Sequence, residues 1–151
     1  MVYLIDTNHC SYIINRDEQV IQKISSLNES DKLAINTTIY GELIMMAKNS
    51  QRKEENLKEI EKFIAALIAE IYPLDKTTGE IYGEFKAELF DKFAPKEKNK
   101  RRKYKLSEAG IYDNDLWIAC TAIQHNAIIV SQDSDFRQMN LVRNLKVECW
   151  K

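Results

Sequence analysis

Short apolar runs alternate with longer amphipathic stretches along this chain. This pattern predicts an α/β fold with a mostly parallel central sheet of about four to five strands flanked by helices. The length of 151 residues is enough for one compact domain and too short for two. A composition of 44% hydrophobic and 30% charged residues is typical of a folded globular protein rather than a disordered chain. We therefore expect a single domain over residues 1–151.

The first half of the chain predicts two strands and four helices. Val2–Ile5 and Leu33–Ile35 are apolar and rich in strand-forming residues, as expected of strands that are buried on both faces. Between and after these strands, apolar residues recur at helical spacing. They predict a short helix after Asp6, a second helix from Asp17, a third helix capped by Thr37 or Thr38 with Met46 in its apolar stripe, and a long helix over residues 51–71.

In the second half of the chain, Ala127–Val130 is the clearest strand. Pro73 restricts the short run Tyr72–Leu74 to an edge or an end of the sheet. The other elements that periodicity predicts are helices over Thr77–Phe93 and Asp113–His125, a helical turn over Asp135–Met139 and a last strand over Val147–Cys149.

The charge of the chain is unevenly distributed, although its net charge is only −1. Eight basic residues and a single acid, Glu97, lie between Lys92 and Lys105, so the rest of the chain is acidic. The segment over about residues 95–107 lacks apolar periodicity and is predicted to be an exposed loop or a frayed helix end. A basic segment can hold the polyanion that an acidic pocket repels. Its candidate residues for binding a nucleic-acid backbone are Lys98, Lys100, Arg101, Arg102, Lys103 and Lys105.

The sequence favours a cytoplasmic protein without a membrane partner. Asp6 comes too early for the apolar region of a signal peptide, and the longest apolar run, Phe63–Ala69, is far too short to span a bilayer. The cysteines have no Cys-x-x-Cys spacing and lie among apolar neighbours. They are therefore predicted to be buried free thiols in a reducing compartment, at positions Cys10, Cys120 and Cys149.

Four carboxylates are expected to meet at one edge of the sheet. Asp6 and Asp133 follow predicted strands, whereas Glu42 and Asp115 lie near the starts of predicted helices. In open α/β sheets, the carboxyl ends of the strands face a crevice in which ligands bind. Glu42 is the hardest of the four to explain by structure alone, because a buried carboxylate within an apolar stripe requires a partner.

Such a group of carboxylates requires a cation. Two carboxylates ~5 Å apart repel each other by roughly 3 kcal/mol at an effective dielectric constant of about 20. Oxygen ligands favour a hard ion, so Mg²⁺ or Mn²⁺ is predicted, whereas His9 and His125 are too few and too far apart for a zinc site. Two further acids have a structural interpretation, Asp113 as the cap of its helix and Asp135 as the cap of the following turn.

Four motifs occur in a fixed order over nearly the whole chain. Tyr3–Asn8 is an apolar strand that ends in Asp-Thr-Asn, and Glu42 is an acid in the helix after the second strand. Asp115–Cys120 starts a helix with Asp-Leu-Trp-Ile-Ala-Cys, and Val130–Phe136 has a hydroxyl residue, an acid two residues later, and Asp-Phe. Together these motifs resemble the PIN-domain ribonucleases, and within them the VapC-type toxins of bacterial toxin–antitoxin pairs, which usually have alanine in place of Cys120.

The resemblance implies a single PIN-like domain and a metal-dependent endoribonuclease. It makes Asp6, Glu42, Asp115 and Asp133 the metal-binding and catalytic residues, with Asp113, Asp135, Thr7, Asn8 and Ser131 as polar neighbours of the site. It also implies a homodimer, an RNA target that is often transfer RNA, and inhibition by a cognate antitoxin. The basic segment is longer than the family's usual connection at this place.

In the predicted reaction, the carboxylates hold the metal ion while a water molecule attacks the scissile phosphorus, with one carboxylate as general base. Two other functions remain open. Asp6 after the first strand also suits a phosphoryl-transfer protein with an aspartyl phosphate, although no lysine follows an apolar strand as a phosphate partner. A non-catalytic nucleic-acid-binding module would use the acids for a structural metal and the basic segment for affinity.

Overall fold

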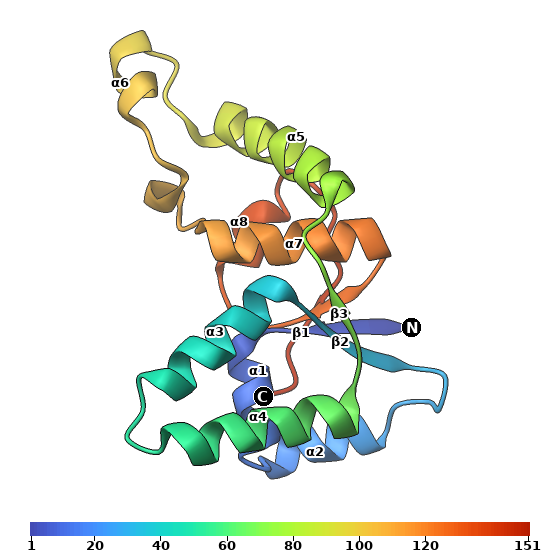
Figure 1. Ribbon diagram of the computed structural model, residues 1–151. Helices are drawn as coiled ribbons and strands as arrows, with labels where there is room; N and C mark the ends of the chain where they lie inside the picture. Colours follow the sequence, from blue (N-terminus) through green and yellow to red (C-terminus); the bar gives the residue numbers. More distant parts are fainter.

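Five parallel strands form one central sheet in the computed structural model, which describes residues 1–151. The sheet order is β3-β2-β1-β4-β5 (Figure 1). The strands are β1 (Val2–Ile5), β2 (Lys32–Asn36), β3 (Ile68–Tyr72), β4 (Ile128–Val130) and β5 (Val147–Glu148). The predicted α/β fold with a parallel sheet is therefore confirmed.

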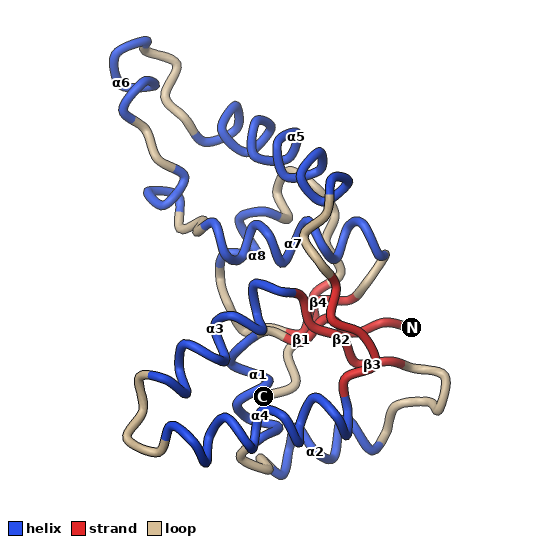
Figure 2. Tube along the Cα trace, in the orientation of Figure 1, coloured by secondary structure: helices blue, strands red, loops and turns tan.

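Helices cover both faces of this sheet. In the first half of the chain they are α1 (Thr7–Ile14), α2 (Glu18–Ser25), α3 (Thr37–Lys48) and α4 (Lys53–Leu67). The second half contains α5 (Lys76–Phe93), α6 (Lys98–Lys103), the 3₁₀ helix η1 (Leu106–Ala109), α7 (Asp113–His125) and α8 (Asp135–Met139). Figure 2 shows α1, α2 and α4 on one side of the strands and α5, α7 and α8 on the other, with α3 leaving the end of β2. No helix is both long enough and apolar enough to span a membrane.

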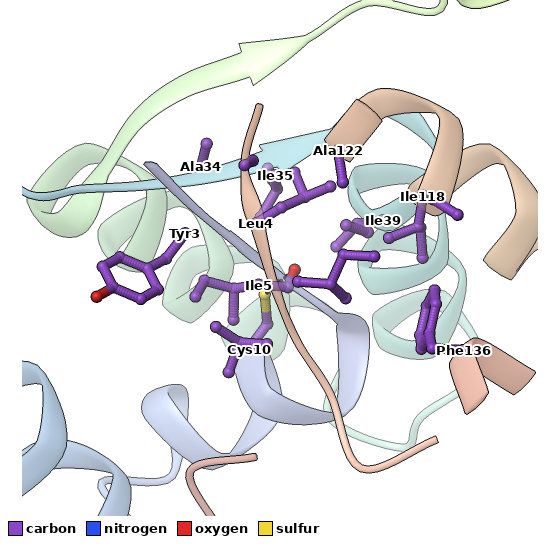
Figure 3. Close-up of a cluster of buried hydrophobic side chains, with 14 of the residues drawn as sticks. Tyr3, Leu4, Ile5, Cys10, Ala34, Ile35, Ile39, Ile118, Ala122 and Phe136 are labelled. Carbon is purple, nitrogen blue, oxygen red and sulfur yellow. Dashed lines mark hydrogen bonds between the residues drawn. The ribbon is translucent and has the colours of Figure 1, made fainter. Parts of the chain in front are cut away.

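The central strand β1 is apolar because helices and neighbouring strands enclose it. Tyr3, Leu4 and Ile5 are all buried, and Figure 3 shows them packed with side chains from β2, α1, α3, α7 and α8. Burial of each large apolar side chain stabilises the fold by roughly 1.5–3 kcal/mol. The strand ends at Asp6, whose backbone N–H still donates to the carbonyl of Val130 at 3.1 Å. The core thus fixes where the first carboxylate emerges, beside the end of β4.

The prediction of where the long helix ends is wrong. Helix α4 stops at Leu67, and residues Ile68–Tyr72 form β3 instead, so the predicted strand at Tyr72–Leu74 lies several residues too late. Ile64, Leu67 and Ile71 continue the helical spacing, but pairing of this segment with β2 satisfies its backbone as an edge strand. Pro73 follows and ends the strand, because proline has no N–H for the ladder.

Three smaller expectations are also corrected. Helix α3 is capped by Asn36, whose Oδ1 accepts the N–H of Ile39 at 2.9 Å, and not by Thr37 or Thr38. Cys10 and Cys120 are buried as predicted, whereas Cys149 is exposed beside the edge strand β5. Met46, which was predicted to lie in the apolar stripe of α3, is 45% exposed and is not part of the core.

Within the basic segment, which was predicted to be an exposed loop or a frayed helix end, residues Lys98–Lys103 form a short helix, α6, and the residues on either side of it are loop. Glu97 caps α6 by accepting the backbone N–H groups of Asn99 and Lys100, and no residue of α6 is buried. Figure 1 shows α6 projecting beyond the end of α5, away from the sheet. Arg101 ties this projection down through an ion pair with Asp91 at 2.5 Å. After η1, Gly110 adopts φ +75°, a left-handed conformation that suits glycine, and the chain turns into α7.

Candidate metal centre

A pocket opens at the point in the sheet where the order of the strands reverses direction, between β1 and β4. The chain runs outward from β1 to β2 and β3, and then returns to place β4 on the other side of β1. Ligands of open α/β sheets bind beyond the carboxyl ends of the strands at this kind of reversal. The structure has a cavity of about 510 Å³ here, lined by Asp6 after β1 and by Asp133 after β4.

All four carboxylates that the sequence singles out line this one cavity. These carboxylates come from four separate segments of the chain and meet at one place, as predicted: Asp6, Glu42, Asp115 and Asp133. Among their predicted neighbours, Thr7, Asn8 and Asp113 also line the cavity, whereas Ser131 and Asp135 are buried next to it. The remaining lining residues are Met45, Met46, Tyr112, Asn114 and Ile118.

Asp6 has one carboxylate oxygen held by the protein. Its Oδ1 accepts the backbone N–H of His9 at 2.7 Å, which caps α1, and also lies 3.0 Å from Nδ1 of the same histidine. Its Oδ2 receives no hydrogen bond from the protein. Because Asp6 lines the cavity, Oδ2 is left available there for a ligand.

Glu42 is half-buried and has two hydrogen-bonding partners. These partners explain how a carboxylate can lie within an apolar stripe. The hydroxyl of Thr7 donates to Oε2, and Nδ2 of Asn114 donates to Oε1 at 2.7 Å. The helix that carries Glu42 is itself anchored to α7, because Nδ2 of Asn36 donates to the buried hydroxyl of Thr121 at 2.9 Å. Contacts with α1 and α7 therefore orient this carboxylate toward the other acids.

Asp115, Asp133 and Asp135 form the tightest group of acids. One carboxylate oxygen from each lies within 4.8 Å of the other two. Asp135 is buried and its Oδ2 accepts the backbone N–H of Tyr112 at 3.0 Å, so it holds the residue that precedes α7 and does not cap its own turn. Ser131 stabilises the loop after β4, since its hydroxyl accepts the N–H of Asp133 at 3.0 Å.

Without a cation, this group of acids retains a proton. Burial, the hydrogen bond with Asp135 and the nearby charges of Asp133 and Glu42 raise the pKa of Asp115 to about 8. Burial likewise raises the pKa of Asp135, although the Tyr112 N–H opposes the shift. A divalent cation would replace the proton and relieve the repulsion. The donor set is composed of oxygen atoms, so the residues fit a hard cation.

Asp113 does not cap α7, which corrects the structural interpretation of this residue. The cap position belongs to Tyr112, which makes no side-chain capping bond. The Asp113 carboxylate instead accepts the Tyr82 hydroxyl at 2.8 Å and the Lys86 ammonium at 2.9 Å. Although partial burial opposes the shift, these two donors and the positive charge of Lys86 lower the pKa of Asp113. Asp113 is therefore already neutralised by a partner from α5.

Several residues of the site were not foreseen from the sequence. Asn114 binds Glu42 directly, and its position between two acids of an Asp-Asn-Asp triplet was an available signal. Lys86 and Tyr82 reach the site only because α5 packs on α7, and His9 was considered only as a zinc ligand. No local pattern in the sequence marks these three.

Known proteins are similar to this chain over nearly its whole length. The family model described as the PIN domain matches residues 3–141. Ribonuclease VapC1 of Haemophilus influenzae is 27% identical over 99% of this chain and 98% of its own, and the tRNA(fMet)-specific endonuclease VapC of Salmonella typhimurium is 27% identical over 98% and 97%. The crystal structure of VapBC2 from Rickettsia felis, bound to a DNA fragment from its promoter, contains a chain with a TM-score of 0.77 and 27% identity, with both chains fully covered. The protein belongs to the PIN domain family.

Proposed function

We propose that this protein is a Mg²⁺- or Mn²⁺-dependent endoribonuclease that acts as the toxin of a toxin–antitoxin pair. The observation that carries the proposal is that Asp6, Glu42, Asp115 and Asp133 line one cavity at the reversal point of the sheet. Relatives that align over nearly their full length are named ribonucleases and a transfer-RNA endonuclease, which supports RNA as the substrate.

The residues that would hold the ion are the four carboxylates that line the cavity, Asp6, Glu42, Asp115 and Asp133. When bound, a divalent ion supplies Lewis-acid stabilisation of a phosphoryl oxygen and lowers the pKa of water. The protein fixes its ligands beforehand: Thr7 and Asn114 orient Glu42, and Tyr112 N–H holds Asp135 beneath Asp115. A carboxylate oxygen that faces the substrate accepts the proton of the attacking water.

Removal of divalent cations is expected to abolish RNA cleavage, because the repelling carboxylates then hold a proton instead of an ion. The measurement is cleavage of transfer RNA after treatment with EDTA, followed by addition of Mg²⁺ or Mn²⁺ in excess, which should restore the activity. Cleavage that persists in EDTA would contradict the proposal. RNA affinity without turnover at any metal concentration would instead support a non-catalytic module, and a labelled protein formed from a phosphate donor would support an aspartyl phosphate.

We also propose that α6 binds the RNA backbone. Its candidate contacts are Lys98, Lys100, Arg102, Lys103 and the flanking Lys105. No residue of the helix is buried, and the helix carries no acid. Arg101 has a second role, because it pairs with Asp91 and lies over the Phe90 ring at 4.9 Å, which anchors the projection to α5. The acidic cavity repels a polyanion, so positive charge on a neighbouring projection favours its approach.

Neutralising α6 is expected to reduce the salt dependence of RNA binding. The variant combines Lys98→Gln, Lys100→Gln, Arg102→Gln and Lys103→Gln, and it retains Arg101 as the anchor. Each lost phosphate contact should lower the slope of log affinity against log salt by about 0.7 for single-stranded RNA. Binding of a fluorescent RNA is measured at several salt concentrations in an Asp115→Asn background.

The matched control removes the same charge from exposed lysines of α3 and α4, which lie at the opposite end of the molecule (Figure 1). It combines Lys48→Gln, Lys53→Gln, Lys58→Gln and Lys62→Gln. Equal slopes in the two variants would show that α6 contributes only to the general charge of the protein.

Further partners follow from the relatives. The Rickettsia felis structure is a VapBC assembly, and we propose a cognate antitoxin for this chain together with a homodimer. The cavity that holds the acids has Met45, Met46 and Tyr112 at its rim, and these side chains are 54%, 45% and 60% exposed. A partner segment with apolar and basic side chains would complement this rim and the carboxylates beneath it.

A further inference from the structure

A buried histidine lies directly behind the first carboxylate of the metal centre. His9 is in α1 and is completely buried, with hydrogen-bonding partners on both ring nitrogens. Its Nδ1 lies 3.0 Å from Oδ1 of Asp6, and its Nε2 accepts the backbone N–H of Trp150 at 3.3 Å. The ring therefore connects a residue after β1 with a residue near the end of the chain.

These contacts define which nitrogen carries the hydrogen. Since Nε2 accepts from the Trp150 N–H, the ring hydrogen is on Nδ1 and points at Asp6. The ring also meets Tyr12 edge-on, with centroids 5.6 Å apart, so its orientation is restricted on a third side. Both the tautomer and the orientation of His9 are set by its surroundings.

The Trp150 end of this connection is firmly held. Trp150 is 3% exposed, its ring lies 5.3 Å from that of Tyr3, and its indole N–H donates to Glu148 at 2.9 Å. The ammonium group of Lys151 then pairs with Asp17. The last residues of the chain thus support His9 from the side opposite to Asp6.

Capping of α1 does not require the ring of His9. The backbone N–H of His9 satisfies the cap by itself, at 2.7 Å from Oδ1, and most helix caps have no more than this bond. The ring supplies a second donor to the same oxygen. Two donors on Oδ1 fix the rotation of the carboxylate group and leave Oδ2 for the cavity.

We propose that His9 is a positioning residue, which holds Asp6 in its metal-binding orientation and is itself held by the backbone of Trp150. This inference rests on the proposed metal centre. Groups that hydrogen-bond to metal ligands orient them, and their replacement typically costs about 10–100-fold in metal affinity or activity.

Two replacements separate the two ends of the connection. In His9→Asn, the side-chain amide takes the place of Nδ1 and still reaches Asp6, but it is too short for Trp150. In His9→Gln, the amide takes the place of Nε2 and reaches Trp150, but it no longer donates to Asp6. Each variant therefore loses one of the two hydrogen bonds of the ring: His9→Asn loses the bond with Trp150, and His9→Gln loses the bond with Asp6.

The experiment measures Mn²⁺ affinity of the metal-free full-length protein, by following free Mn²⁺ with electron paramagnetic resonance. His9→Gln should bind about 10-fold more weakly than the wild type, and His9→Asn should bind within about twofold of it. Equal affinities of the two variants, or weaker binding by His9→Asn, would overturn the proposal, because a purely structural histidine would not distinguish them. Wild-type protein that binds Mn²⁺ but does not cleave RNA would refute the nuclease while leaving the positioning role intact.

A measurement on the wild type covers the case in which a replacement fails to fold. The chain has two histidines, so histidine ¹⁵N resonances are readily assigned. Nuclear magnetic resonance should show the His9 ring protonated at Nδ1 and unprotonated at Nε2, with a shift of its Nδ1 resonance when Mg²⁺ is added. A ring protonated at Nε2 alone, or one that does not respond to Mg²⁺, would contradict the proposal.

Discussion

Replacement of Asp115 with asparagine is expected to reduce RNA cleavage by about 100-fold or more. Even groups that only hydrogen-bond to metal ligands contribute about 10–100-fold, and Asp115 lies at the centre of the acids. The fold should not suffer, because asparagine removes a charge that burial and three neighbouring acids disfavour. The measurement is the rate of cleavage of transfer RNA in saturating Mg²⁺, together with the urea midpoint of each protein.

Asp6→Asn serves as a second variant, since Asp6 lines the same cavity but comes from a different segment of the chain. Glu61→Gln is the matched control, because Glu61 is an exposed acid of α4 that lies outside the cavity. Full activity of both aspartate variants would end the proposal of a carboxylate-bound catalytic ion. A loss of activity accompanied by a lower urea midpoint would indicate misfolding instead.

Much of the fold was predictable because its inner strands are short apolar runs. Apart from the first residues of β1 and β2, all residues of β1, β2 and β4 are buried, and this leaves a clear apolar pattern. β3 was missed because an edge strand is only partly buried. Its isoleucines, Ile68 and Ile71, also satisfy the spacing of the preceding helix.

The candidate site could likewise be predicted only in part from the sequence. The four carboxylates that the sequence predicts for the site each follow a strand or lie near the start of a helix, and such positions can be recognised once the order of elements is known. The burial of each acid and its hydrogen-bonding partners could not be predicted from the sequence. Asp135 is buried and accepts the N–H of Tyr112, 23 residues away and just before α7, and Asp113 is neutralised by Lys86 from α5. These contacts depend on packing between helices, which leaves no periodic signal.

The stability of the metal-free protein is expected to fall as the pH rises from about 4 to about 8. In the unfolded chain, Asp115 loses its proton near its ordinary pKa of 3.8, whereas the folded protein keeps that proton up to about pH 8. Within this window the unfolded state binds fewer protons, so the free energy of unfolding decreases with pH. The slope should be a fraction of about 1.4 kcal/mol per pH unit, the limit for one proton, because Asp115 is partly exposed and coupled to Asp135.

Urea unfolding in EDTA at pH 5, 6, 7 and 8 measures this slope, and Asp115→Asn should flatten it. The acids whose pKa is lowered, such as Asp75 and Asp113, titrate below this window and do not obscure it. With saturating Mg²⁺ the sign reverses, because the ion binds the charged carboxylates and its stabilisation increases as the competing proton leaves. An identical slope in the wild type and in Asp115→Asn would show that the acids are too well solvated to retain a proton. The mutual repulsion on which the proposed cation site depends would then be absent.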